Sequence, residues 1–224
     1  MILQPLDWPW EPHAGAPAPA PSGGVPQVFQ TRWPLAATQA DLLAAELSVE
    51  EQARLARFRQ PADRLRFLTG RAMVRRMLGA HFGRPPAAVA IRLGEHGKPW
   101  APPPAGRPVL HFNIAHAGDL VLAAFSLRHE VGVDVEVIQA APEWAAIAPR
   151  LMSPAAHRDW LALAPAEQTQ AFFAAWTSHE AALKALGSGL TDDFTLPVLP
   201  VLQQAKLELP AGYAGALAYI AKSL

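Results

Sequence analysis

The chain has 224 residues, of which 51% are hydrophobic, with no cysteine and a formal net charge of zero. A chain of this length and apolar content can bury a sizeable core, as one large domain or two small ones. The lack of cysteine excludes disulfides and thiol chemistry. No run of 18 apolar residues and no secretory signal is found, so we expect a cytoplasmic protein without a membrane partner.

The first half opens with an irregular segment and continues with two helices. Residues 1–26 are rich in proline, alanine and glycine and predict an irregular strap, followed by a strand over residues 28–33. Ser48-Val49-Glu50-Glu51 has the capping-box pattern that opens a helix. Pro61 separates this helix from a second one that runs to about Phe82. The buried stripe of the second helix is predicted to contain Leu65, Leu68, Ala72 and Leu78.

These two helices carry a dense cluster of arginines, in a stretch of 23 positions whose only acid is Asp63. Three interpretations are open: a solvated basic face, a nucleic-acid contact, or a site for a small polyanion. Because the chain as a whole is neutral and the cluster is local, we favour a small polyanion and expect no nucleic-acid partner. The cluster consists of Arg54, Arg57, Arg59, Arg64, Arg66, Arg71, Arg75 and Arg76.

Four strands are predicted in the middle of the chain, over residues 89–93, 109–115, 120–127 and 131–138. A Gly97-Lys98-Pro99 turn and a proline-rich loop separate the first two strands. The turns that join the last three strands are short, which predicts antiparallel pairing.

The last of these strands carries two carboxylates on one face. Valines at positions 131, 133, 135 and 137 alternate with Gly132, Asp134 and Glu136, which is the pattern of a half-buried strand. Residues two apart on a strand are separated by about 6.5 to 7 Å. Two acidic side chains at that distance are often only solvated, but they can also converge on one hard cation.

A second acidic segment lies on a predicted helix that follows Pro165 and ends near Gly187. Trp176, Glu180 and Lys184 recur every four residues and therefore form one stripe. Such an acid and base are commonly a solvated pair worth about 0.2 to 0.5 kcal/mol. In a cleft, the same pair could serve a metal and a phosphate.

The order in which four segments of the sequence occur makes these individual motifs more informative. Gly97-Lys98-Pro99, residues 112–118 (FNIAHAG), residues 132–136 (GVDVE) and residues 176–189 resemble the Sfp-type 4′-phosphopantetheinyl transferase family. Residues 57–75 resemble the basic N-terminal helix of that family, so the resemblance covers about residues 45 to 195. Several ordered motifs are more specific than any single one.

The resemblance implies an α+β fold of two similar α/β halves, related by a pseudo-twofold, with the active site between them. We expect an N-terminal half over residues 1–107 with the arginine-rich, coenzyme A-binding helices, and a C-terminal half over residues 108–224 with the metal-binding acids. A faint internal repeat, which places residues 68–71 over residues 176–179, agrees with a duplication.

The resemblance also implies the reaction. A serine hydroxyl of an apo acyl or peptidyl carrier protein attacks the β-phosphorus of coenzyme A and releases 3′,5′-ADP, with Mg²⁺ neutralising charge on the phosphoryl oxygens. We expect a monomeric enzyme of secondary metabolite biosynthesis. The implied residues are Asp134, Glu136 and Glu180 as metal ligands, Glu180, Asp134 and Lys184 as catalytic residues, Arg54 and Arg66 for the 3′-phosphate, and Lys98, His116 and Lys184 for the other phosphates.

The sequence departs from the family pattern at four positions. Ala115 and Ala117 stand where serines usually flank the histidine, His179 stands where a lysine is common, and Glu51 occupies a frequently basic position. These losses of phosphate donors concern coenzyme A affinity more than the metal site.

Two functions of other classes remain open. One is a catalytically weak relative that binds coenzyme A or a carrier, and the other is a nucleic-acid-binding protein that uses the arginine-rich helices. The acid and lysine set consists of Asp134, Glu136, Glu180 and Lys184. The presence of all four residues favours the enzyme. The sequence leaves open whether fatty-acid, polyketide or nonribosomal-peptide carriers are modified.

Overall fold

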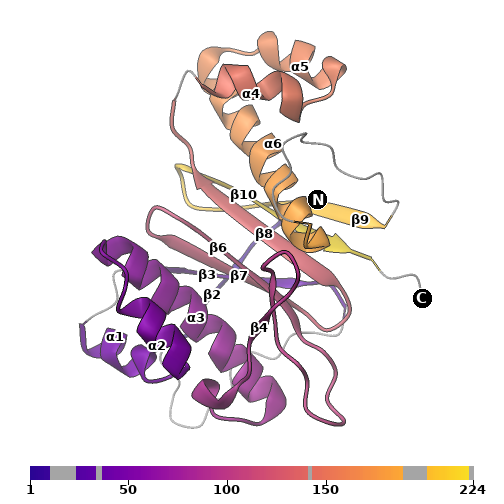
Figure 1. The fold of residues 1–224 in the computed structure, drawn as a ribbon. Coiled ribbons are helices and arrows are strands. Elements are labelled where there is room, and N and C mark those ends of the chain that lie inside the picture. The colour runs from indigo at the N-terminus through magenta and orange to yellow at the C-terminus, as the bar shows by residue number, and fades with distance from the viewer. Residues whose placement is uncertain (11–23, 34–36, 141–142, 189–200, 222–224) are drawn as a thin grey trace.

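The computed structural model describes residues 1–10, 24–33, 37–140, 143–188 and 201–221, which form a mixed α+β fold (Figure 1). This result confirms the predicted α+β class. The main strands form two four-stranded sheets, and a separate hairpin joins β4 and β5. The strands are β1 (Ile2–Leu3), β2 (Leu6–Asp7), β3 (Gln27–Arg32), β4 (Arg92–Leu93), β5 (Pro99–Trp100), β6 (His111–Ala117), β7 (Leu120–Ser126), β8 (Glu130–Val137), β9 (Leu202–Leu207) and β10 (Tyr213–Ile220).

Both sheets are built by the same succession of elements. Strand β3, helix α3 (Pro61–Phe82), β6 and β7 form one set, and β8, helix α6 (Pro165–Leu186), β9 and β10 form the other. In each set the last strand lies in the middle and pairs antiparallel with both neighbours, in the orders β3-β7-β6 and β8-β10-β9. Strands β2 and β1 then extend these sheets by parallel pairing with β3 and β9. The N-terminal segment therefore pairs with both sheets.

The two sheets meet along β6 and β8. The side-chain oxygen of Asn113 on β6 accepts a hydrogen bond from the Val133 N–H on β8, at 2.9 Å. One hydrophobic cluster draws residues from both sheets, including Leu122 and Leu217. The division predicted at residue 107 stays a prediction; β6 and β7, which follow it, pair into the sheet that contains β3.

Each sheet is covered by one long helix. Helices α3 and α6 both have a proline in the first turn, where no backbone donor is needed, and both end at a glycine in the left-handed region, Gly83 (φ 65°) and Gly187 (φ 70°). Figure 1 shows α1 to α3 gathered at one end of the molecule and α4 to α6 at the other. The shorter helices are α1 (Ala37–Ala44), α2 (Val49–Leu55), α4 (Trp144–Leu151) and α5 (Pro154–Leu161).

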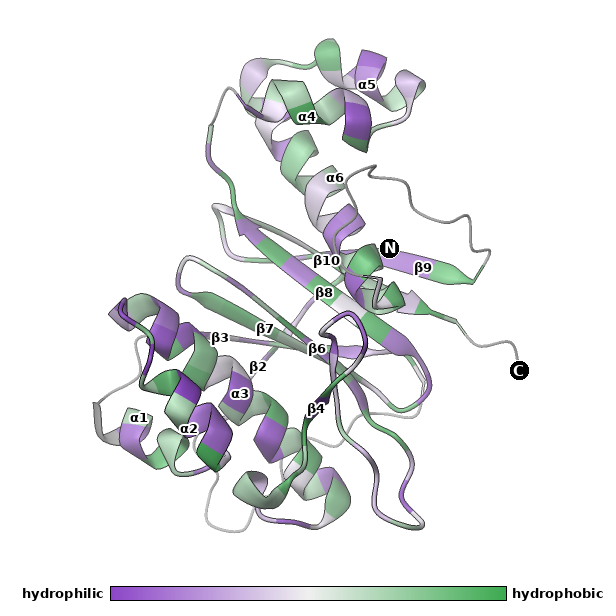
Figure 2. Cartoon of the chain, viewed as in Figure 1, coloured by the Kyte–Doolittle hydropathy of each residue, from purple (hydrophilic) through white to green (hydrophobic). Residues whose placement is uncertain are grey.

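Strand β7 shows why sequence pattern and sheet position agree. It is buried along its whole length and is almost wholly hydrophobic (Figure 2). It lies in the middle of its sheet, where α3 packs against it and the hydrophobic cluster shared with the other sheet also includes it. A strand covered on both faces needs apolar residues on both.

Several predicted elements are confirmed and others are corrected. The strand near residues 28–33 is present as β3, and the capping box of α2 is formed, with Ser48 Oγ accepting from the Glu51 N–H at 3.3 Å. The strand predicted over residues 89–93 is wrong in length, because a 3₁₀ turn (Pro86–Ala88) precedes it and only Arg92–Leu93 pairs. Part of the predicted N-terminal strap, residues 11–23, lies outside the described residues, and residues before it form β1 and β2.

Candidate active site

Helix α6 lies unusually close to strand β8. A Cβ atom built on Gly132 would lie 2.0 Å from the Ala181 carbonyl oxygen and 2.3 Å from the Ala185 backbone nitrogen. Only glycine allows this approach, so the backbones of helix and strand are in direct contact there. The close packing brings side chains of α6 within reach of the acidic face of β8.

The Trp176, Glu180 and Lys184 stripe of α6 faces that strand. The Lys184 ammonium donates a hydrogen bond to Asp134 Oδ1 at 2.6 Å. Trp176, which lies one helical turn before Glu180, hydrogen-bonds the side chain of Glu136. The first and last residues of the predicted stripe thus hydrogen-bond the two acids of the predicted strand face.

The three carboxylates share one electrostatic environment. Burial raises the pKa of Asp134, Glu136 and Glu180, and the Lys184 charge opposes this in each case. Asp134 raises the pKa of both other carboxyls, and Glu180 raises that of Glu136. Three acids that oppose one another's ionisation favour the arrival of a cation.

The donor set fits a hard divalent cation. Asp134 Oδ2 and Glu180 Oε1 are buried oxygens that have no hydrogen-bond partner, and carboxylate oxygens are the ligands that Mg²⁺ prefers. Among the described residues no three metal-ligating side chains form a ready-made cluster. Instead, the Lys184 ammonium supplies the positive charge beside Asp134, which is only 5% exposed.

Two adjoining cavities continue from this cluster and share Pro99 and Asn113. The first, of about 270 Å³, holds Lys98, Glu180 and Lys184. The second, of about 190 Å³, brings together three other predicted residues, Arg54, Arg66 and His116, along with Arg71. The structure therefore places the predicted phosphate-binding residues in one continuous region.

The cations of the smaller cavity are held in place by the fold. Arg66 Nε donates to the Gly118 carbonyl at 2.8 Å, and its Nη1 pairs with Asp63 at 2.8 Å. The Arg54 guanidinium lies over the Phe67 ring, 5.0 Å from its centroid. Burial lowers the pKa of His116, and the charges of Arg66 and Lys184 act in the same direction.

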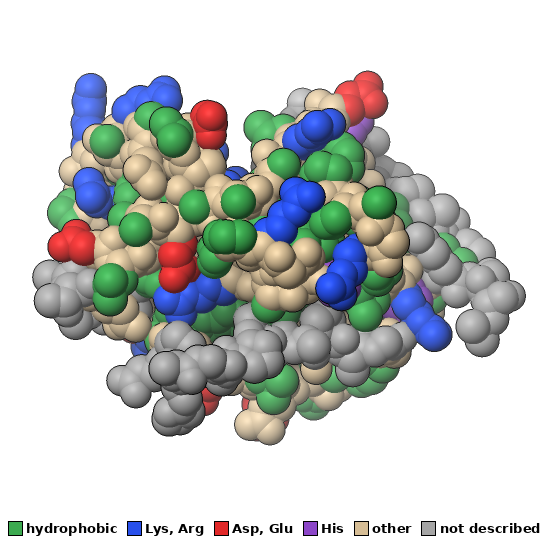
Figure 3. Space-filling view, turned by 90° about the horizontal axis from the view of Figure 1, so that it is seen from below, with side chains coloured by type: hydrophobic (Ala, Val, Ile, Leu, Met, Phe, Trp, Pro, Cys, Tyr) green, Lys and Arg blue, Asp and Glu red, His purple; other side chains and the backbone are tan. Residues whose placement is uncertain are grey.

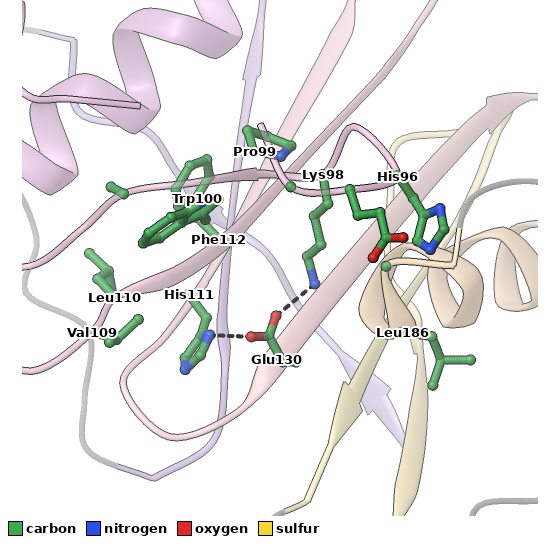
Figure 4. Close-up of a pocket in the computed structure, with 14 residues that line it drawn as sticks. His96, Lys98, Pro99, Trp100, Val109, Leu110, His111, Phe112, Glu130 and Leu186 are labelled. Carbon is green, nitrogen blue, oxygen red and sulfur yellow. Dashed lines mark hydrogen bonds and ion pairs between the residues drawn. The ribbon is translucent and has the colours of Figure 1, made fainter. Parts of the chain in front are cut away.

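Lys98 is held by a network that the sequence did not reveal. Its ammonium donates to Glu130 Oε2 at 2.8 Å and to the Ala185 carbonyl at 3.0 Å. In a third cavity of about 440 Å³, His111 and Lys98 both point at the Glu130 carboxylate (Figure 4). The His111 hydrogen bond and the Lys98 charge lower the pKa of Glu130 to about 2. Glu130 was predicted to precede the strand over residues 131–138, whereas it is the first residue of β8. Its place in the same alternation as Asp134 and Glu136 is the sequence signal that could have identified it.

Two members of the arginine cluster have structural roles. Arg75 is fully buried, where it contacts Glu51 and donates to the carbonyls of Pro86 and Val89. Arg76 forms a two-pronged ion pair with Glu46, at 2.8 and 2.9 Å. The interpretation of the whole cluster as one anion site is therefore wrong for these two residues.

The positions that depart from the family pattern lie at different depths. His179 is only 6% exposed, and it is not among the described residues that line the three cavities. Ala115 is buried in the cluster between the sheets.

Figure 3 shows one face of the molecule, on which Lys and Arg side chains are scattered among hydrophobic ones and form no continuous basic stripe.

Comparison with known proteins gives a consistent result. A family model described as "4'-phosphopantetheinyl transferase, N-terminal" matches residues 31–127, and one described as "4'-phosphopantetheinyl transferase superfamily" matches residues 130–215. A 4'-phosphopantetheinyl transferase of Bacillus subtilis is 32% identical over 183 residues, which cover 80% of this chain and 79% of the relative.

Two further relatives agree with it. The 4'-phosphopantetheinyl transferase HetI of Nostoc sp. strain PCC 7120 is 32% identical over 81% of this chain and 78% of its own length. The 4'-phosphopantetheinyl transferase Sfp of Bacillus subtilis strain 168 is 30% identical over 81% of this chain and 79% of its own length. Together with the acid and lysine set between helix α6 and strand β8, these matches show that the chain is an enzyme of the 4′-phosphopantetheinyl transferase family.

Proposed function

We propose that the enzyme transfers the 4′-phosphopantetheine group of coenzyme A to a serine of an apo acyl or peptidyl carrier protein and releases 3′,5′-ADP. The observation that carries this proposal is the continuity of the site. Buried carboxylates lie beside Lys184, and the cavity that contains Lys184 adjoins a second one that contains Arg54, Arg66 and His116. A linear molecule with a diphosphate and a separate 3′-phosphate matches two adjoining cationic sites.

Asp134, Glu136 and Glu180 would hold Mg²⁺, which neutralises charge on the phosphoryl oxygens when it is bound. Their two unpartnered buried oxygens and mutual repulsion support this assignment. Glu180 has a second role in the proposal. In this role its carboxylate accepts the proton of the carrier serine.

The chemical step forms one bond and breaks one bond. The serine oxygen bonds to the β-phosphorus as its proton passes to Glu180, and the bond from that phosphorus to the bridging oxygen breaks, so that 3′,5′-ADP leaves. Lys184 and Lys98 line the same cavity and hold the phosphates, sharing their charge with Asp134 and Glu130. In this proposal Arg54 and Arg66 bind the 3′-phosphate and His116 a phosphate nearby.

The two sets of elements support a duplicated architecture. We infer that the halves are related by a pseudo-twofold, because each follows the order strand, helix, strand, strand with the last strand in the middle. A monomeric state, a cytoplasmic location and a pathway in secondary metabolism remain part of this proposal. Among the residues that the structure describes, no helix is both long enough and apolar enough to cross a lipid bilayer.

The direct test is intact-mass measurement of apo carrier proteins. The enzyme is incubated with coenzyme A, Mg²⁺ and fatty-acid, polyketide and nonribosomal-peptide carriers, and we expect one phosphopantetheine to be added to at least one of them. Chelation of the metal, or replacement of Asp134 by Ala, should remove most of the transfer. Full transfer in excess chelator would contradict the metal assignment, and no transfer to any carrier would favour the binding-only relative.

A further inference from the structure

The small cationic cavity contains a third guanidinium in addition to Arg54 and Arg66. Arg71 lies on α3, one turn after Phe67, and lines this cavity with an exposure of only 14% for its side chain. The guanidinium carbons of Arg54 and Arg71 lie 5.0 and 5.7 Å from the centroid of the same Phe67 ring. Like charges gathered around one small cavity repel each other unless an anion is present.

The charge around Arg71 is not balanced by the protein. In the described part of the chain Glu51 is the carboxylate that pairs with Arg71, with Nε 3.6 Å from Oε1. The same carboxylate also pairs with the buried Arg75 through its other oxygen. One negative charge is therefore shared by two guanidiniums, which leaves one positive charge uncompensated.

The uncompensated charge resides at Arg71 rather than at Arg75. Arg75 donates through Nη1 to the backbone carbonyls of Pro86 and Val89, inside the fold. Arg71 Nη1 is buried and has no hydrogen-bond partner. Burial also lowers the pKa of Arg71, and the charges of Arg54 and Arg75 act in the same direction. A buried, unpaired guanidinium donor is unfavourable, and an anion in the cavity relieves it.

We propose that Arg71 is a ligand of the phosphate held by Arg54 and Arg66, and that it restores the positive charge which Glu51 removes from the first helix. This inference rests on the proposed function, in which that phosphate is the 3′-phosphate of coenzyme A. Glu51 is then a positioning residue. Its carboxylate is fixed by the capping box at Ser48 and by Arg75, and it holds the Arg71 side chain against the cavity.

The test measures binding directly and needs neither metal nor turnover. Calorimetric titration compares adenosine 3′,5′-diphosphate with adenosine 5′-monophosphate, which lacks the 3′-phosphate, for wild type, Arg71→Gln and Arg71→Lys. The matched control is Arg64→Gln, an exposed arginine on the same helix outside the cavity. We expect Arg71→Gln to weaken the diphosphate about 10- to 100-fold. Arg71→Lys should show a smaller loss, because lysine keeps the charge without the planar fork.

The monophosphate should bind equally to wild type and to all three variants. If Arg71→Gln keeps the wild-type preference for the diphosphate, or weakens both nucleotides equally, the inference is overturned while the proposed function stands. If wild type itself shows no preference for the diphosphate and transfers nothing, the proposed function fails instead. Should Arg71→Gln not fold, as judged by its thermal transition, Arg71→Lys decides the question, and an unchanged affinity for the diphosphate overturns the inference.

Discussion

Replacement of Gly132 by Ala tests whether the contact between α6 and β8 sets the geometry of the site. The new methyl carbon would lie 2.0 Å from the Ala181 carbonyl oxygen, whereas contacts under 3.0 Å are essentially never seen, so the helix must move by about 1 Å or more. The 2.6 Å hydrogen bond between Lys184 and Asp134 would then lengthen beyond hydrogen-bonding range. We therefore expect a loss of stability and a larger loss of activity.

The expected magnitudes follow from this displacement. Overpacking typically costs about 1 to 3 kcal/mol, which lowers Tm by about 2 to 12 °C in a chain of this size. A misplacement of about 1 Å in a catalytic group can reduce the rate by about 100-fold. Urea unfolding and the transfer rate should be measured on the same preparation, with Gly24→Ala as control, because a Cβ there meets nothing within 4 Å. Wild-type stability and activity in Gly132→Ala would refute the reasoning.

Three further predictions concern charge. Because burial raises the pKa of Asp134, Glu136 and Glu180, their contribution to stability is present at low pH and is lost as pH rises through the folded-state pKa. Saturating Mg²⁺ should therefore raise Tm by about 5 to 10 °C at pH 8, and by less at pH 5, where more of these carboxyls are protonated. The metal site would be contradicted if Tm did not rise in wild type, or if it rose equally in Asp134→Ala. The pKa of Glu130 is lowered to about 2, so ionised Glu130 contributes to the free energy of unfolding at neutral pH. Because its side chain is 42% exposed and therefore screened, we expect a contribution of about 1 to 2 kcal/mol. This contribution should be lost as the pH falls from about 4.5 to 2. Acid unfolding of Glu130→Gln should therefore be shallower over that range, and an unchanged curve would contradict the network. His179→Lys should destabilise the fold by about 2 to 4 kcal/mol, because residue 179 is only 6% exposed and burial of an ammonium group is unfavourable. An unchanged Tm in that variant would mean that the lysine side chain reaches solvent.

Local patterns in the sequence were sufficient to predict the acidic centre of the site. The alternation of valines placed Asp134 and Glu136 on one face, and the spacing of four placed Glu180 and Lys184 on another, because both periods depend only on the local backbone. The hydrogen bond from Trp176 to Glu136 could not be predicted in the same way. It depends on the register of helix against strand, which a tertiary contact at a glycine determines.

The fate of the arginine cluster shows a second limit. Composition predicts that a basic segment favours an anion, but not which arginines face it. Arg75 and Arg76 are withdrawn from the site by Glu51 and Glu46, which lie 24 and 30 residues earlier in the chain. The structure is needed to show that Glu51, a departure from the family pattern, is already paired within the protein.

The repeat within the chain was also placed imperfectly. The predicted alignment placed residues 68–71 over residues 176–179, an offset of 108 residues, whereas the glycines that end the two long helices, Gly83 and Gly187, are 104 residues apart. Strands β9 and β10 were not predicted, because their alanine- and glutamine-containing sequences have weak strand propensity and their pairing is decided by distant neighbours.

The pairing of β1 with β9 has a consequence for the order in which the enzyme is made. All strands of the sheet β2-β3-β7-β6 have left the ribosome once Ser126 has emerged. Strand β8, which carries the acids, pairs with β10, which begins 83 residues after the start of β8, and β1 pairs with β9, which begins 200 residues after the start of β1. Contacts this distant in sequence form slowly, because a long loop must close first. The N-terminal sheet can therefore fold during synthesis, while the acidic strand and the segment 2–3 stay unpaired until nearly the whole chain is available. Expression conditions that slow aggregation at this late stage should improve the yield of folded enzyme.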